Sequence, residues 1–199
     1  MASEEQISNK IITVPNLVSF VRLAAIPVFC WLVLGPARWT AATILFALIA
    51  LTDWVDGYLA RRLDQVTRLG KALDPVADRL LIAAAIIVGL LAGIVPPVIG
   101  ITLIVREVYM ALVTFAMVSR RGGVLEVRWL GKLATFIVYS SVGWFYMAAI
   151  EFLEFLTLPL AWAAGIAGLI LYWTTAIQYT GDALRIVSEL ESAASSEES

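Results

Sequence analysis

Residues 53–78 read DWVDGYLARRLDQVTRLGKALDPVAD and lie between two long apolar runs. The stretch combines four carboxylates with small residues and an arginine, at Asp53, Asp56, Gly57, Ala60, Arg61, Gly70, Asp74 and Asp78. On a helix, spacings of three and four place the first five of these on one face, and they place the last two one turn apart. Ionisable groups are costly inside a membrane, so four acids between membrane-length apolar runs predict a functional site.

The chemistry of these side chains predicts a binding site for a hard divalent cation. The chain has no histidine, and its single cysteine, Cys30, lies in an apolar run. A site made only of carboxylate oxygens suits Mg²⁺ or Mn²⁺. Ion pairs between the acids and nearby arginines are the competing structural interpretation, but they do not explain the small residues placed among the acids.

At these positions the chain resembles the CDP-alcohol phosphotransferases, whose signature is D-x2-D-G-x2-A-R-x8-G-x3-D-x3-D. All eight signature residues are present at the family's spacing, and the opening VPNLVSFVRL, residues 14–23, is also similar to the family. The resemblance implies an enzyme with two divalent ions, held by Asp53, Asp56 and Asp74. It further implies that Asp78 is both a ligand and the base for the acceptor hydroxyl.

The resemblance also implies a donor substrate, CDP-diacylglycerol, from which CMP leaves. Its nucleotide and diphosphate would bind at the remaining signature residues, Gly57, Ala60, Arg61 and Gly70. The small residues would let the nucleotide lie against bare backbone, where a larger side chain would collide. Arg61 would pair with phosphate. A homodimer is one more implication of the resemblance.

The amino-acid composition indicates the class of protein. The chain has 199 residues, of which 61% are hydrophobic and 15% charged, and its mean hydropathy is +0.89. Such an apolar chain is typical of helical membrane proteins and not of soluble domains. The net charge of −2 argues against nucleic acid as a partner. We therefore expect the partners to be membrane lipids, the lipid donor and a hydroxyl-bearing acceptor.

Six apolar segments of about 20 residues are each long enough to cross a hydrocarbon core of about 30 Å. They predict an all-α, polytopic membrane protein with six transmembrane helices, and the resemblance implies the CDP-alcohol phosphotransferase fold. The predicted spans are residues 14–34, 39–59, 70–93, 98–118, 133–149 and 158–180. A polar segment, 1–12, precedes the membrane catalytic domain, 13–187. The acidic, serine-rich tail, 188–199, is predicted to be disordered.

Basic residues concentrate in two of the links between these spans. The two links contain Arg61, Arg62, Arg68, Lys71, Arg120, Arg121, Arg128 and Lys132. The links on the opposite side contain only Arg38. Cytoplasmic loops of membrane proteins are enriched in Lys and Arg. We therefore expect an integral protein of the bacterial cell membrane, with both termini and the aspartate motif on the cytoplasmic side.

Two features of the spans leave alternatives open. Arg22, about a third of the way along the first span, either snorkels to the near interface or lines the site and meets phosphate. A stripe of small residues in the third span, Ala85, Gly89 and Gly93, allows close approach of helices. Packing within the monomer is the favoured interpretation of the stripe, and a dimer seam is the alternative.

The acceptor is predicted from the cations that would bind it. The chain resembles bacterial phosphatidylglycerophosphate synthases through the signature. In those enzymes a further arginine follows an Arg–Glu pair in the fourth span, and the fifth span begins G-K-x-K-T. The extra cations suit glycerol 3-phosphate, a dianion. This chain keeps Arg106, Glu107 and Lys132 but lacks that arginine and has Ala134 in place of the second lysine.

Two other segments favour a different acceptor. VRWLGKLATF, residues 127–136, and LYWTTAIQY, residues 171–179, are similar to the actinobacterial cardiolipin synthases of the same family. Those enzymes transfer the phosphatidyl group to phosphatidylglycerol, a monoanion that needs fewer cations. We therefore expect phosphatidylglycerol as the acceptor, bound by Arg106 and Lys132. Glycerol 3-phosphate is the alternative.

Two other classes of protein also use intramembrane acids. Prenyltransferases bind a diphosphate lipid through Mg²⁺, but their two acidic motifs lie far apart in sequence, whereas here both fall within 53–78. A cation transporter would explain the carboxylates but not Gly57, Ala60 and Arg61, and the chain has no evident internal repeat. Release of CMP from CDP-diacylglycerol would separate an enzyme from a transporter.

Overall fold

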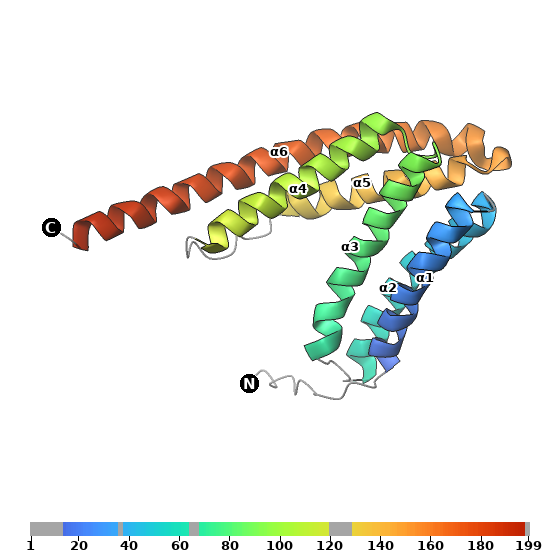
Figure 1. Cartoon of the computed structure of the whole chain (residues 1–199), viewed down its shortest axis with the longest axis horizontal. Coiled ribbons are helices and arrows are strands. Elements are labelled where there is room, and N and C mark those ends of the chain that lie inside the picture. The colour runs from blue at the N-terminus through green and yellow to red at the C-terminus, as the bar shows by residue number, and fades with distance from the viewer. Residues whose placement is uncertain (1–13, 36–37, 64–67, 120–128, 198–199) are drawn as a thin grey trace. The chain divides into compact units, whose positions relative to one another are not determined.

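The computed structural model describes residues 14–35, 38–63, 68–119 and 129–197, with side chains outside 14–19, 53–75, 190–191 and 193–197 (Figure 1). Within those ranges the chain forms no strand, which confirms the all-α prediction. The helices are α1 (Val14–Leu34), α2 (Trp39–Leu63), α3 (Arg68–Leu91), α4 (Pro97–Ser119), α5 (Trp129–Ala148) and α6 (Glu151–Glu197). The first five lie over the first five predicted spans, with ends shifted by about a turn at most.

Two segments, Pro97–Ser119 and Glu151–Glu189, are long and apolar enough to cross a membrane, judged on the described residues. Two shorter apolar stretches, Phe20–Leu34 and Trp39–Thr52, lie in α1 and α2. Most side chains of the two longer segments are not buried within the chain. An exposed apolar surface on a long helix is what contact with lipid requires.

The chain divides into two compact units. Unit 1 comprises Met1–Val95 with Phe145–Thr157, and unit 2 comprises Pro96–Trp144 with Leu158–Ser199. Unit 1 therefore contains α1, α2 and α3 together with the last turn of α5 and the first turns of α6. Unit 2 contains α4 and most of α5 and α6.

In unit 1, α1 packs against both α2 and α3 (Figure 1). The rings of Phe29, Phe46 and Tyr146 form a cluster with centroids 5.3 to 5.7 Å apart. Buried tyrosine hydroxyls need a partner, and the Tyr146 hydroxyl donates to the Ala85 carbonyl at 2.8 Å. The Thr43 hydroxyl donates to the Tyr146 carbonyl at 2.9 Å. These bonds fix the last turn of α5 within unit 1.

The small-residue stripe of α3 packs inside the same unit. Ala85 is completely buried. A Cβ added to Gly89 would lie 2.6 Å from Cγ2 of Val95 and 3.0 Å from the Tyr146 hydroxyl. Gly93 follows the helix with a φ of 74°, a left-handed conformation that glycine adopts readily at a helix C-terminus. The structure thus gives Ala85 and Gly89 the packing role within the monomer that we expect.

In unit 2, α6 runs along α4 and α5 (Figure 1) and approaches both through glycines. A Cβ on Gly165 would lie 3.1 Å from Cδ1 of Ile99 on α4. A Cβ on Gly168 would lie 3.0 Å from the backbone nitrogen of Val138 on α5. Glycine lets helices come this close, which is a common way of packing membrane helices.

The sixth helix is longer than the predicted span of 158–180. It begins at Glu151 and continues to Glu197, through most of the segment predicted to be disordered. The side chains of Ser188 and Ser192 donate to carbonyls one turn earlier. The difference has a physical reason, because Ala, Glu and Leu favour helix and extending a formed helix needs no new nucleus.

Candidate active site

The aspartate motif lies on α2 and α3 of unit 1. Its first half is in the last turns of α2, and its second half is in the first turns of α3. The side chains of most motif residues lie outside the described part of the chain: Asp53, Asp56, Gly57, Ala60, Arg61, Gly70 and Asp74. Their backbone is helical, as the prediction of a shared face requires. The geometry of the motif side chains stays a prediction.

Asp78, on α3, is the motif carboxylate whose side chain the structure describes. Nη1 of Arg22, on α1, donates to Oδ1 of Asp78 at 2.9 Å. The Arg22 side chain is 2% exposed and that of Asp78 is 46% exposed. Arg22 is therefore buried, and the snorkelling interpretation is wrong. A charge-assisted bond of this length holds the Asp78 carboxylate in a defined position on the side of α3 that meets α1.

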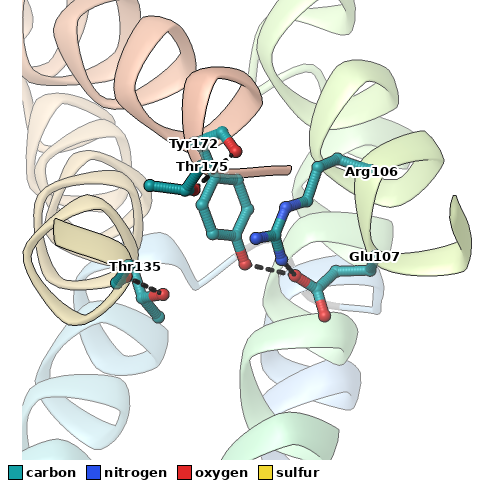
Figure 2. Close-up of polar contacts among 6 residues, drawn as sticks. Arg106, Glu107, Thr135, Tyr172 and Thr175 are labelled. Carbon is teal, nitrogen blue, oxygen red and sulfur yellow. Dashed lines mark hydrogen bonds and ion pairs between the residues drawn. The ribbon is translucent and has the colours of Figure 1, made fainter. Parts of the chain in front are cut away.

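A second polar site lies in unit 2, where Arg106 and Glu107 of α4 meet Tyr172 of α6 (Figure 2). We call these three side chains the guanidinium cluster. Nη1 of Arg106 donates to Oε1 of Glu107 at 3.2 Å, and the Tyr172 hydroxyl donates to the same oxygen. The Arg106 guanidinium carbon lies 3.6 Å from the centre of the Tyr172 ring. Ion pairing, hydrogen bonding and a cation–π contact thus meet at one point.

The cluster places a cation where water has little access. Arg106 is 9% exposed and Tyr172 is 2% exposed, whereas the Glu107 side chain is 40% exposed. A buried charge is costly unless it is paired, and Glu107 supplies the countercharge. Nε of Arg106 is buried and has no hydrogen-bond partner among the described residues. An anionic oxygen arriving here would meet a donor that is already desolvated.

Lys132, the other predicted acceptor-binding residue, is exposed on the first turn of α5. Its neighbour Gly131 lies against α6, because an added Cβ would be 2.8 Å from the Tyr179 hydroxyl. The Thr135 hydroxyl donates to the Gly131 carbonyl at 2.8 Å (Figure 2). Ala134 is completely buried. The described contacts do not join Lys132 to the guanidinium cluster.

Two contacts of these sites could not be predicted from the sequence. The sequence of the segment that contains Tyr172 indicates a similarity to other proteins but no role for this residue. A tyrosine in an apolar span does indicate a buried hydroxyl that needs a partner. A partner for Arg22 on another helix could not be chosen from sequence, which does not show which helices pack together. In the structure, where α1 packs against α3, Arg22 bonds to Asp78.

The comparisons with known proteins agree with the resemblance. Residues 12–177 match the family of CDP-alcohol phosphatidyltransferases. A cardiolipin synthase (CMP-forming) of Streptomyces coelicolor is 34% identical over 195 residues, 90% of this chain and 86% of that protein. A putative cardiolipin synthase of Mycobacterium tuberculosis is 42% identical over 130 residues, 64% of this chain and 61% of that protein.

The chain is also similar to a protein whose name includes the alternative acceptor, glycerol 3-phosphate. The CDP-diacylglycerol–glycerol-3-phosphate 3-phosphatidyltransferase of Bacillus subtilis is 34% identical over 161 residues, 74% of this chain and 82% of that protein. No solved structure matches the chain. The family match covers most of the sequence, so the chain belongs to the CDP-alcohol phosphatidyltransferase family. It is a transferase of phospholipid biosynthesis, and its long apolar helices make it a membrane protein.

Proposed function

We propose that the enzyme transfers the phosphatidyl group of CDP-diacylglycerol to phosphatidylglycerol, forming cardiolipin and CMP. A free hydroxyl of phosphatidylglycerol attacks the phosphorus that carries the diacylglycerol. The bond from that phosphorus to the CMP oxygen breaks, and the hydroxyl proton passes to a base. The similarity to the Streptomyces coelicolor cardiolipin synthase over 90% of the chain supports this choice of acceptor.

The observation that carries the proposal is the sparse positive charge among the described residues around Arg106. Among the described residues of unit 2, Arg106 is the buried guanidinium, and it already has Glu107 as a countercharge. Ala134, where a second lysine would be needed, is completely buried and supplies no charge. Each uncompensated charge is costly in a partly desolvated site. A monoanionic phosphodiester fits this supply of cations better than a dianion does.

The donor site of the proposal is the aspartate motif. Asp53, Asp56 and Asp74 would hold two divalent ions, Mg²⁺ or Mn²⁺, with Asp78 as a further ligand. The fit rests on the donor set, since carboxylate oxygens are the ligands that these hard cations prefer. When bound, the ions neutralise charge on the diphosphate and polarise the attacked phosphorus.

The other motif residues would bind and orient the donor. Gly57, Ala60 and Gly70 would leave room for the nucleotide beside the backbone of α2 and α3, and Arg61 would pair with the diphosphate. Asp78 would accept the proton of the acceptor hydroxyl. Its bond to Arg22 supports this role by holding the carboxylate in place.

The proposal includes six membrane spans with the motif facing the cytoplasm. The helices α1 to α5 have 20 to 25 residues each, which at 1.5 Å per residue is enough for a core of about 30 Å. The basic links between spans support the orientation. A homodimer, which the resemblance implies, is also part of the proposal.

The proposal is tested by supplying each acceptor separately to purified protein in lipid vesicles containing CDP-diacylglycerol and Mg²⁺. Mass spectrometry identifies the lipid product, and CMP is measured alongside it. We expect phosphatidylglycerol to give cardiolipin and CMP in equal amounts, and glycerol 3-phosphate to give little product. The similarity to the Bacillus subtilis protein supports the second candidate, glycerol 3-phosphate. Product from that acceptor alone would select it.

A further inference from the structure

One side chain on the opposite helix contacts both charged members of the guanidinium cluster. Arg106 and Glu107 are consecutive on α4, so their side chains leave the helix about 100° apart. Tyr172 of α6 contacts both, its ring lying against the guanidinium and its hydroxyl pointing to Glu107 (Figure 2). The Thr175 hydroxyl donates to the Tyr172 carbonyl at 2.9 Å on the same helix.

The two contacts of Tyr172 leave the guanidinium ready for another anion. The ring covers one face of Arg106 at 3.6 Å, which leaves the N–H groups at the edges of the guanidinium. Those edges match the oxygens of a phosphate group. Nη1 is bonded to Glu107, and Nε is buried with no hydrogen-bond partner among the described residues. The cluster thus presents a desolvated donor in a fixed orientation.

The Tyr172 hydroxyl also shares the carboxylate oxygen of the ion pair. It donates to Oε1 of Glu107, the oxygen that Arg106 uses. The Nη1 to Oε1 distance is 3.2 Å, longer than the roughly 2.7–2.9 Å of a strong charge-assisted bond. Glu107 therefore supplies countercharge to the buried guanidinium without occupying it fully.

We propose that Tyr172 is a positioning residue, which stacks on Arg106 and holds Glu107 aside so that the guanidinium can bind the phosphate of the acceptor. This inference rests on the proposed function, in which Arg106 belongs to the acceptor site. It predicts that Tyr172 affects acceptor binding and not the chemical step. Without the hydroxyl, Glu107 would pair closely with Arg106 and compete with the acceptor.

The test compares Tyr172→Phe with Tyr109→Phe in the full-length protein in lipid vesicles. Tyr109 is a matched control because it also joins α4 to α6, through a bond of 2.7 Å between its hydroxyl and that of Thr180, outside the cluster. We expect Tyr172→Phe to raise the KM for the acceptor about tenfold, since a hydrogen bond to a charged group is lost. Its kcat and its KM for CDP-diacylglycerol should stay within about twofold. Tyr109→Phe should change none of them.

An unchanged acceptor KM in Tyr172→Phe, or a loss that falls on kcat or on the donor KM, would overturn the inference. Glu107→Gln provides a second test if Tyr172→Phe fails to fold. It removes the competing charge and should lower the acceptor KM several-fold, and it should restore the KM when combined with Tyr172→Phe. A raised KM in Glu107→Gln would contradict the proposal.

The same measurements separate this inference from the proposed acceptor. Each variant is assayed with phosphatidylglycerol and with glycerol 3-phosphate. If the wild-type protein uses only glycerol 3-phosphate, the choice of phosphatidylglycerol is wrong. The KM of the variants for glycerol 3-phosphate then still decides whether Tyr172 positions Arg106.

Discussion

At the scale of single residues, the part-buried bond between Arg22 and Asp78 links the first helix to the motif. Arg22 is 2% exposed and lies 2.9 Å from the carboxylate, so its position is set by the packing of α1 on α3. The carboxylate is partly exposed, on a residue that the family signature marks. Such a contact orients a functional group as well as joining two helices.

Replacing Arg22 tests this double role. We expect Arg22→Gln to lower the unfolding free energy by about 1–2 kcal/mol, since a bond between charged groups is lost and Asp78 can still be hydrated. We also expect it to reduce phosphatidyl transfer at least about tenfold, because misplacing a reacting group is costly. Thermal unfolding in detergent and CMP release are the measurements. Arg38→Gln, at an exposed arginine, is the control, and equal behaviour of the two variants would contradict the account.

We expect substitutions of the motif acids to have different effects, according to the role of each acid. Asp53→Asn, Asp56→Asn and Asp74→Asn should abolish CMP release and weaken binding of CDP-diacylglycerol, since each removes an oxygen ligand of a hard cation. Asp78→Asn should keep donor binding but lose transfer, since an amide cannot take the proton. Donor binding with and without chelator, alongside circular dichroism to confirm folding, makes the distinction. Loss of donor binding in Asp78→Asn would identify it chiefly as a ligand.

The site could be predicted in part because helical spacing is local. Acids three and four residues apart share a face on any helix, so the spacing of the motif is enough to single out its residues. The contacts of Arg22 and Tyr172 depend on which helices pack together, and no spacing within one helix contains that information. The guanidinium cluster is an example, since Arg106 and Glu107 are adjacent in sequence and both are contacted by a side chain from α6.

At the scale of helices, the apolar segments predicted where each helix lies. The composition of the C-terminal segment, however, predicted that the last helix ends earlier than it does. The acidic, serine-rich segment 188–197 reads as disordered, yet it continues α6 to Glu197. A preceding helix removes the cost of nucleation, which a composition argument does not include. The glycines of α6 also show what the sequence leaves open, because only the three-dimensional structure shows which of them lie against another helix.

Two glycines on α6 provide a matched pair for testing this packing. A Cβ on Gly168 would lie 3.0 Å from the Val138 backbone nitrogen, whereas one on Gly181 would have no neighbour within 4 Å. We expect Gly168→Ala to lower the unfolding free energy by about 1–3 kcal/mol, because backbone must move. Gly181→Ala should be neutral or stabilising by up to about 1 kcal/mol, because alanine favours helix. Thermal unfolding of the two variants measures the difference, and similar midpoints would show that α5 and α6 do not pack this way.

At the scale of the whole molecule, the distribution of basic residues predicts an orientation in the membrane. Single cysteines in a Cys30-free background should react from the cytoplasmic side at 63–69 and 122–127, and from the far side at 94–97 and 152–156. The reason is that Lys and Arg are concentrated in the two links that include residues 63–69 and 122–127. Membrane-impermeant thiol reagents on intact cells make the measurement. Labelling of 63–69 from outside would reverse the orientation and place the motif away from its nucleotide donor.

The central claim, that this chain makes cardiolipin from CDP-diacylglycerol and phosphatidylglycerol, is tested most directly by competition. Purified protein receives labelled CDP-diacylglycerol with both acceptors at equal concentration, and the ratio of labelled cardiolipin to labelled phosphatidylglycerophosphate gives the ratio of the two kcat/KM values. We expect cardiolipin to predominate by about tenfold or more, because a guanidinium with a countercharge suits a monoanion. Predominance of phosphatidylglycerophosphate would contradict it.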